Sequence, residues 1–188
     1  RPTHRNTPWD AARFEVSGHR WADLSEGGYG VSLLNDGKYG HSAEGHTLGL
    51  TLLRSPVYPD PYAEEGEHRF TYALYPHPGD WRGDTVREAQ DLNAPLQAIV
   101  VPAGGGDWPL AQRFIGTDKP NLRLSALKKA EDGDALVLRL YEALGGRGAA
   151  GIVRRVNLLE EPEGKTVRDG ETIQLEYAPY KVITLELE

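Results

Sequence analysis

The stretch LVLRLYE, at residues 136–142, places leucine at every second position and puts a basic side chain between two of the leucines. Successive side chains of a β-strand point to opposite faces, so a period of two predicts a strand with one buried face. The same alternation recurs along the chain, at Leu48, Leu50 and Leu52, at Phe70, Tyr72 and Leu74, at Leu122 and Leu124, at Ile173 and Leu175, and at Ile183, Leu185 and Leu187. We therefore expect a chain built mainly of half-buried strands.

Turn-forming residues separate these strands. Runs that combine acidic residues or asparagine with glycine favour tight reversals, because glycine adopts positive φ and Asn or Asp bonds the nearby backbone; they lie at 35–37, 64–66, 131–134 and 168–170. One helix is expected, with Thr85 and Glu88 spaced as a capping box and Pro95 ending it. The predicted fold is all-β, an antiparallel, supersandwich-like β-sandwich with one short connecting helix.

The positions of proline-containing and glycine-rich stretches also predict how the chain is organised. The polar, proline-containing start reads as a linker at residues 1–10, entered from an upstream domain that the chain lacks, so we expect the chain to be a fragment. Residues 11–100 form the N-terminal part of the β-sandwich. A glycine-rich loop spans residues 101–118, and residues 119–188 form the C-terminal part.

Composition excludes several classes of function. The net charge is -7 and the basic residues are scattered, which argues against nucleic acid as a partner. No apolar run approaches the ~20 residues of a membrane span, so we expect no membrane partner. The chain has no cysteine, which excludes thiolate metal sites and agrees with a reducing, cytoplasmic compartment.

The residues themselves reveal no catalytic or metal centre. His41 and His46 lack the helical spacing of a zinc pair, as do His68 and His77, so strand-face or surface histidines are the better interpretation. The acidic cluster around Asp60, which comprises Glu64, Glu65 and Glu67 as well, lies beside prolines and reads as a solvated loop. We expect no catalytic residue and no metal ligand in this chain.

Longer runs carry a specific resemblance. WADLSEGGYGVSLLNDGKYG at 21–40 and LGLTLLRSPVYPDP at 48–61 resemble the C-terminal β region of glycoside hydrolase family 38 α-mannosidases. The similarity continues through FTYALYPH at 70–77, GDW at 79–81, LNAPL at 92–96, LKKAEDG at 127–133, LRLYE at 138–142 and APYKVITL at 178–185. It covers nearly the whole chain. Gly37 departs from the pattern, since such sequences often carry cysteine there.

The resemblance implies the activity of a larger protein. Family members are retaining, zinc-dependent α-mannosidases that hydrolyse α-mannosidic linkages in oligosaccharides, with the zinc ligands and the carboxylates in an N-terminal catalytic domain. No such residue can be transferred to this chain. The resemblance therefore implies a non-catalytic domain that is inactive alone, has no cofactor of its own, and has as partners the catalytic domain of the same polypeptide and a mannose-containing oligosaccharide.

If any part of this chain borders the substrate or the catalytic domain, we expect it to be the segment with Tyr29, Asn35, Asp36, Lys38 and Tyr39, because loops between rigid strands often carry binding groups. The alternative is a tight turn that serves backbone geometry alone. Two other functions also stay open. One is an independent carbohydrate-binding module that stacks sugars on Trp21, Tyr29, Tyr39 and Trp81, and the other is a purely structural β-sandwich.

Overall fold

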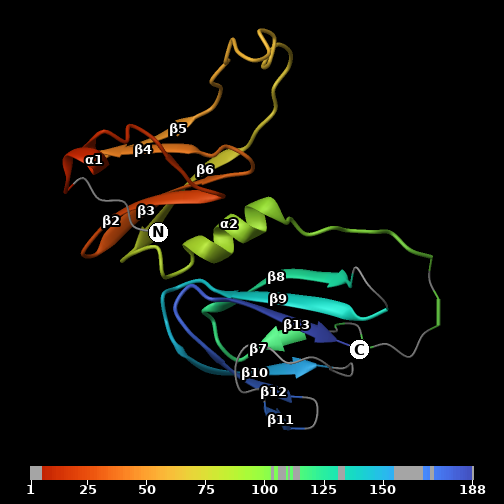
Figure 1. Ribbon diagram of the computed structural model, residues 1–188. Helices are drawn as coiled ribbons and strands as arrows, with labels where there is room; N and C mark the ends of the chain where they lie inside the picture. The colour runs from red at the N-terminus through yellow and green to blue at the C-terminus, as the bar shows by residue number, and fades with distance from the viewer. Residues whose placement is uncertain are drawn as a thin grey trace. The chain divides into compact units, whose positions relative to one another are not determined.

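The computed structural model describes residues 6–102, 104–105, 109, 111, 115–130, 134–154, 167–169 and 172–187. The chain divides into two compact units, residues 1–100 and 101–188, both shown in Figure 1. Strands dominate each unit, and the strand pairs among the described residues are antiparallel. The predicted all-β sandwich is therefore confirmed.

The first unit contains two three-stranded sheets. Their orders are β1-β4-β5 and β2-β3-β6. The elements are α1 (Pro8–Ala11), β1 (Val16–Ser17), β2 (Trp21–Glu26), β3 (Tyr29–Asn35), β4 (Gly40–Glu44), β5 (Thr47–Thr51), β6 (Tyr72–Pro78) and α2 (Thr85–Asn93). Two-residue loops close the β2-β3 and β4-β5 hairpins, and Gly45 supplies the positive φ, 56°, that the second one needs.

Helix α2 covers one face of the β2-β3-β6 sheet (Figure 1). Val86 and Ala89 of the helix are buried, as is Leu34 of β3. Leu34 lies on the same strand face as Ser32, whose hydroxyl contacts Thr85 at the start of α2. The apolar stripe of a short amphipathic helix therefore closes this side of the unit.

The second unit is a two-layered sandwich (Figure 1). Its sheets have the orders β11-β12-β10-β7 and β13-β9-β8. The strands are β7 (Ile115–Thr117), β8 (Leu122–Lys129), β9 (Leu136–Glu142), β10 (Gly148–Arg154), β11 (Val167–Asp169), β12 (Thr172–Tyr177) and β13 (Val182–Leu187). One core joins side chains of both sheets, namely Leu122, Leu138, Leu140, Ala150, Leu175, Tyr177, Ile183 and Leu185. The leucines that alternate along β9 thus point into this core.

Three local expectations differ from the structure. The predicted linker at residues 1–10 ends in helix α1, because Thr7 accepts the Asp10 N–H and Pro8 begins the helix. The predicted loop at 101–118 ends in β7, which pairs with β10. Thr85 does not cap α2, since Asp84 is the N-cap and the Thr85 hydroxyl bonds to Ser32 instead. Residues 1–5, Gly106, residues 131–133 of a predicted turn, and Gly170 lie outside the described residues.

Within the described ranges, no helix has the length and apolar character needed to cross a lipid bilayer.

Candidate functional site

The turn after β3 contains four of the five residues that the sequence singles out. Asn35, which is fully buried, accepts the N–H groups of Gly37 and Lys38 on its Oδ1 at 3.1 and 2.8 Å. Its carbonyl accepts the side-chain amide of Asn93 in α2 at 2.9 Å. Asn35 therefore shapes the turn and anchors it to the helix, as the tight-turn interpretation requires.

The same amide determines the protonation of a buried histidine. Because Asn35 Oδ1 is occupied, its Nδ2 must be the group that donates to His41 Nε2, at 3.3 Å. The other ring nitrogen, Nδ1, then donates to the Tyr39 carbonyl at 3.2 Å. Burial lowers the pKa of His41, although the Tyr39 hydrogen bond and Glu15 act against this. His41 is therefore a neutral histidine with its proton on Nδ1.

Asp36 ties the turn to the segment that enters β6. Its Oδ1 accepts the Thr71 N–H at 2.9 Å, and its own N–H donates to the Thr71 carbonyl at 3.1 Å. The Thr71 hydrogen bond lowers the pKa of the exposed Asp36 carboxyl. The side chain is thus ionised at neutral pH and has a structural partner.

Beyond Asp36, the turn presents a mixed charged and aromatic surface. Lys38 Nζ lies 4.7 Å from the ring centroid of Phe70, and the ring of Tyr39 lies 4.9 Å from that of His19. Tyr39 is 57% exposed. We name the five residues of this region, His19, Asp36, Lys38, Tyr39 and Phe70, the turn surface. Cation–π and aromatic pairs keep its side chains in place without burying them.

A carboxylate next to the turn surface closes the long loop between β5 and β6. Glu64 accepts the N–H groups of Ser55 and Arg54, the latter at 2.8 Å. The hydrogen bonds from Ser55 and Arg54 lower the pKa of Glu64. Burial opposes them, and the charges of His68 and Lys38 lower the pKa by smaller amounts. The acidic cluster that the sequence assigns to a loop therefore includes a carboxylate that holds the base of this loop.

Tyr29 does not join the turn surface. It is 52% exposed but lies at the opposite end of β3 from Asn35, about 20 Å away at ~3.3 Å per residue. Trp21 is half-buried and its ring lies 5.3 Å from that of Trp81. The structure thus brings together Asn35, Asp36, Lys38 and Tyr39, and it separates Tyr29 from them.

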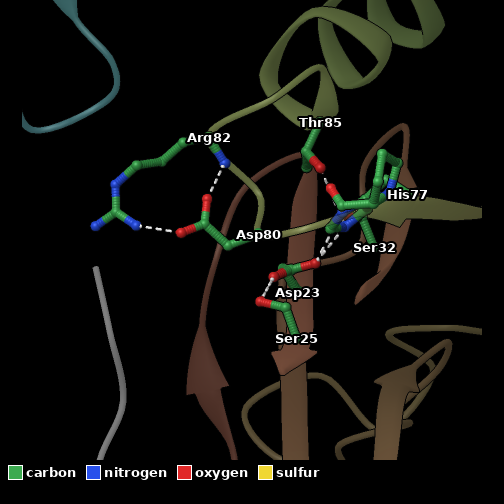
Figure 2. Close-up of polar contacts among 8 residues, drawn as sticks. Asp23, Ser25, Ser32, His77, Asp80, Arg82 and Thr85 are labelled. Atoms are coloured by element: carbon green, nitrogen blue, oxygen red, sulfur yellow. Dashed lines mark hydrogen bonds and ion pairs between the residues drawn. The ribbon is translucent and has the colours of Figure 1, made fainter. Parts of the chain in front are cut away.

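A buried polar network crosses the first unit and was not predicted from the sequence (Figure 2). Asp23 of β2 lies 2.8 Å from His77 Nε2 of β6, and both side chains are at most 4% exposed. Ser25 donates to Asp23 at 2.7 Å, and Ser32 donates to it at 2.9 Å. Thr85 lies 2.7 Å from the Ser32 oxygen. Because the Ser32 proton is given to Asp23, the Thr85 hydroxyl donates to Ser32.

Serine, histidine and aspartate in contact invite comparison with a hydrolase triad, and the geometry excludes one. In a triad the serine and the aspartate use different nitrogens of the imidazole. Here Ser32, at 3.2 Å, and Asp23 both face Nε2 of His77, while Nδ1 lies 3.5 Å from the Pro78 carbonyl. Ser32 is also completely buried. The network joins three strands to α2 and offers no nucleophile to a substrate.

A second buried carboxylate organises the second unit. Glu142, 1% exposed, accepts the N–H groups of Leu144, Gly145, Gly146 and Tyr180 and the amide of Asn121, all at 2.8–3.0 Å. Burial raises the pKa of Glu142, but the hydrogen bonds from Tyr180, Asn121 and the glycine turn outweigh it and lower the pKa to about 2. This carboxylate stabilises the turn after β9 by accepting its backbone N–H groups.

Zinc does not fit the part of the chain that the structure describes. In that part, no three His, Cys, Asp or Glu side chains come together as a possible metal site. His41 and His77, the buried histidines, each have their Nε2 committed to a neighbouring side chain. No catalytic step can therefore be assigned to a metal held by these residues.

Comparison with known proteins assigns the chain to a family. The profile described as glycosyl hydrolases family 38 C-terminal domain matches residues 1–62. The profile described as glycosyl hydrolases family 38 C-terminal beta sandwich domain matches residues 121–185. Alpha-mannosidase 2C1 of Homo sapiens is 42% identical over the whole chain, and alpha-mannosidase G of Dictyostelium discoideum is 47% identical over 78% of it.

The chain spans 19% of the length of the human relative and 14% of the Dictyostelium one. Among solved structures, an alpha-mannosidase from Enterococcus faecalis V583 superimposes over 100% of this chain and 23% of its own, with a TM-score of 0.77 at 18% identity, which supports the fold. Both profiles and the alignment over the whole of this chain agree with the resemblance noted in the sequence. The chain belongs to the C-terminal β domains of the family 38 α-mannosidases.

Proposed function

We propose that this chain is the non-catalytic C-terminal β region of a retaining, zinc-dependent α-mannosidase that hydrolyses mannose-containing oligosaccharides. The observation that carries the proposal is the 42% identity to alpha-mannosidase 2C1 over all of this chain and 19% of that protein. Most of such a polypeptide lies outside the region described. We assign the zinc and the catalytic carboxylates to that remainder, the catalytic domain of the same polypeptide.

The carboxylates of this chain support a non-catalytic role. A glycosidase needs two carboxyl groups that flank the scissile bond and are free to exchange protons or attack the sugar. The most sheltered carboxylates here, Asp23 and Glu142, already accept several protein hydrogen bonds. Asp36 and Glu64 also bind backbone N–H groups. These four side chains serve the architecture of the two units.

For the turn surface we propose contact with the catalytic domain at the rim of its substrate site. Tyr39 is exposed, and the half-buried Lys38 lies over the half-buried ring of Phe70. Asn35 bonds to α2 and Asp36 bonds to Thr71, and these hydrogen bonds fix the conformation of the turn. The side chains of the turn are therefore in position before any contact with the catalytic domain forms. Tyr29, at the far end of β3, is not included in this proposed contact.

The test compares the natural polypeptide that carries this domain with the 188-residue chain. We expect the natural polypeptide to hydrolyse an aryl α-mannoside with retention, as followed by NMR of the first product, and to lose activity on zinc removal. The chain alone should show no turnover. Hydrolysis by the purified chain that disappears on substitution of one of its own carboxylates would overturn the assignment.

The turn surface is tested in the natural polypeptide with Tyr39→Ala and Asp36→Ala. Reduced kcat/KM in either variant, or a lower melting temperature for Tyr39→Ala, supports the contact, whereas a lower melting temperature for Asp36→Ala alone reflects its lost hydrogen bond to Thr71. Unchanged kcat/KM in both variants with an unchanged melting temperature for Tyr39→Ala rejects it. Glu44→Ala, at an exposed position in β4, is the control. Glycan binding by the chain alone would instead favour the carbohydrate-binding module, for which the mutual packing of Trp21 and Trp81 leaves less aromatic surface free.

A further inference from the structure

A short uncharged segment follows α2 and exposes almost all of its apolar surface. Residues 96–101 are Leu, Gln, Ala, Ile, Val and Val, with Pro95 before and Pro102 after them. Leu96 and Val100 are fully exposed, Ile99 is 80% exposed and Val101 is 72% exposed. Soluble domains rarely leave so many neighbouring aliphatic side chains in water, and such patches mark interaction sites. We name residues 96–101 the apolar segment.

The backbone of the apolar segment lies outside the helices and strands that the structure describes. Among the described residues, none of its N–H or C=O groups pairs with another backbone group. Three of the six residues are β-branched, which favours a strand over a helix, and Pro102 disfavours a helical conformation at the residue before it. The last four residues, Ala98 to Val101, are all aliphatic and do not alternate with polar ones, as is typical of strands that are covered on both faces.

We propose that the apolar segment adds as a strand to a sheet edge in the part of the natural polypeptide that lies outside this chain. The proposal rests on the proposed function, because it requires a polypeptide longer than these residues. Related α-mannosidases have more than four fifths of their length outside the aligned region. The partner we infer is an unpaired strand edge beside apolar side chains, without charge, since the segment brings none.

Two features of this chain argue against other occupants. The described sheets of both units do not include the segment, and the hydrophobic core described for the second unit forms without it. A second copy of the chain would bring together two bodies that each carry a net charge of -7. The flanking prolines also stop the segment from extending its pairing, which limits uncontrolled association through a sequence of high β-propensity.

Hydrogen exchange of the natural polypeptide tests whether the segment is paired. We expect the amides of residues 96–101 to exchange at least about 100-fold more slowly than those of an unstructured peptide, whereas exposed loop residues such as Val57 should exchange freely. Val100→Asp should remove this protection and Val100→Ile should retain it. Free exchange of the wild-type segment would overturn the proposal.

Cross-linking identifies the occupant. With Val100→p-benzoylphenylalanine in the natural polypeptide, we expect an intramolecular cross-link to a peptide outside residues 1–188. A cross-link within residues 1–188, or one that joins two copies, overturns the proposal. Neither measurement needs turnover, so a polypeptide that lacks α-mannosidase activity would reject the proposed function and still leave the strand addition testable.

Discussion

At the scale of single residues, the informative groups are buried polar side chains whose burial and hydrogen bonds together determine their charge. Asn35 and His41 form one such pair, and Glu142 with its backbone donors is another. In both cases the fold selects one protonation state, which links pH to stability. The two groups respond over different pH ranges, because a histidine and a carboxyl titrate differently in the unfolded chain.

His41 should make stability fall in mild acid. Its pKa in the folded protein lies below its ordinary value of 6.5, so the unfolded chain binds the proton first as the pH falls. The contribution of neutral His41 is present above about pH 6.5 and is lost below it. Urea unfolding at pH 7.5 and 5.5 measures this, and His41→Gln should reduce the difference, whereas His46→Gln should not. A greater loss of stability in acid for His41→Gln than for the wild type would contradict the assignment.

Glu142 should affect the stability of the protein at lower pH than His41 does. Its pKa falls from an ordinary 4.5 to about 2, so its contribution is present above about pH 4.5 and is lost as the pH falls toward 2. At neutral pH we expect Glu142→Gln to cost about 3 kcal/mol, because an amide offers one acceptor oxygen to donors that two carboxylate oxygens served. Glu176→Gln, at an exposed position in β12, is the control. Equal unfolding free energies for the two variants would contradict this role.

At the scale of elements, strand packing depends on one glycine in β3. A Cβ added at Gly30 would lie 2.4 Å from His77 Cε1 and 2.7 Å from Ser25 Cβ. Both neighbours bond to Asp23: His77 is buried and Ser25 is exposed, so a shift of either side chain disturbs a hydrogen bond of the network. The absence of a side chain at Gly30 is therefore what allows three strands to share one polar cluster.

Gly30→Ala should destabilise the first unit by about 1–3 kcal/mol, the usual cost of overpacking. Gly28→Ala is the matched control, since nothing lies within 4 Å of a Cβ at that position. NMR of the His77 ring should show that its contact with Asp23 changes in the first variant only. Equal melting temperatures for the two variants would show that the network tolerates the displacement.

The elements also show how far a sequence can predict this structure. The alternation in β9 and β13 predicts those strands, because each leucine face enters one core. Strand β7 lacks this signal, since Ile115-Gly116-Thr117 is too short to alternate and owes its structure to β10. Asn35-Asp36-Gly37 predicts a turn locally. Its partner Thr71 is 35 residues away and follows only from the tertiary fold.

The buried network was missed for a related reason. Asp23, Ser32 and His77 look like ordinary polar strand residues, and only the register of β2, β3 and β6 places them side by side. Thr85 suggests a helix cap in the sequence, but the nearby Ser32 hydroxyl takes its hydrogen bond. Tyr29 and Tyr39 are close in the sequence, but the extended strand β3 lies between them and holds their side chains far apart.

At the scale of the whole molecule, each of the two units contains a buried polar network of its own among the described residues. Asp23 and His77 form buried hydrogen bonds within residues 1–100, whereas Glu142 forms them within residues 101–188. No hydrogen bond described above joins the two networks. Substitutions in them should therefore behave as separate perturbations.

We expect Gly30→Ala and Glu142→Gln to lower two different unfolding transitions in calorimetry. Their effects should add in the double variant within about 0.5 kcal/mol, as is usual for sites without shared partners. A single transition that both substitutions shift equally, or strong non-additivity, would show that the two units unfold as one.

The turn after β3 also bears on how the protein ages. An aspartate followed by glycine is chemically fragile, because the glycine nitrogen can attack the aspartate carboxyl to form a succinimide and then isoaspartate. In this turn the Gly37 N–H is held by Asn35 Oδ1, and the Asp36 carboxylate is ionised and held by Thr71. The two groups that would react, the Gly37 nitrogen and the Asp36 carboxyl, are therefore each held by another hydrogen bond. The folded turn therefore preserves a bond that the unfolded chain would slowly lose.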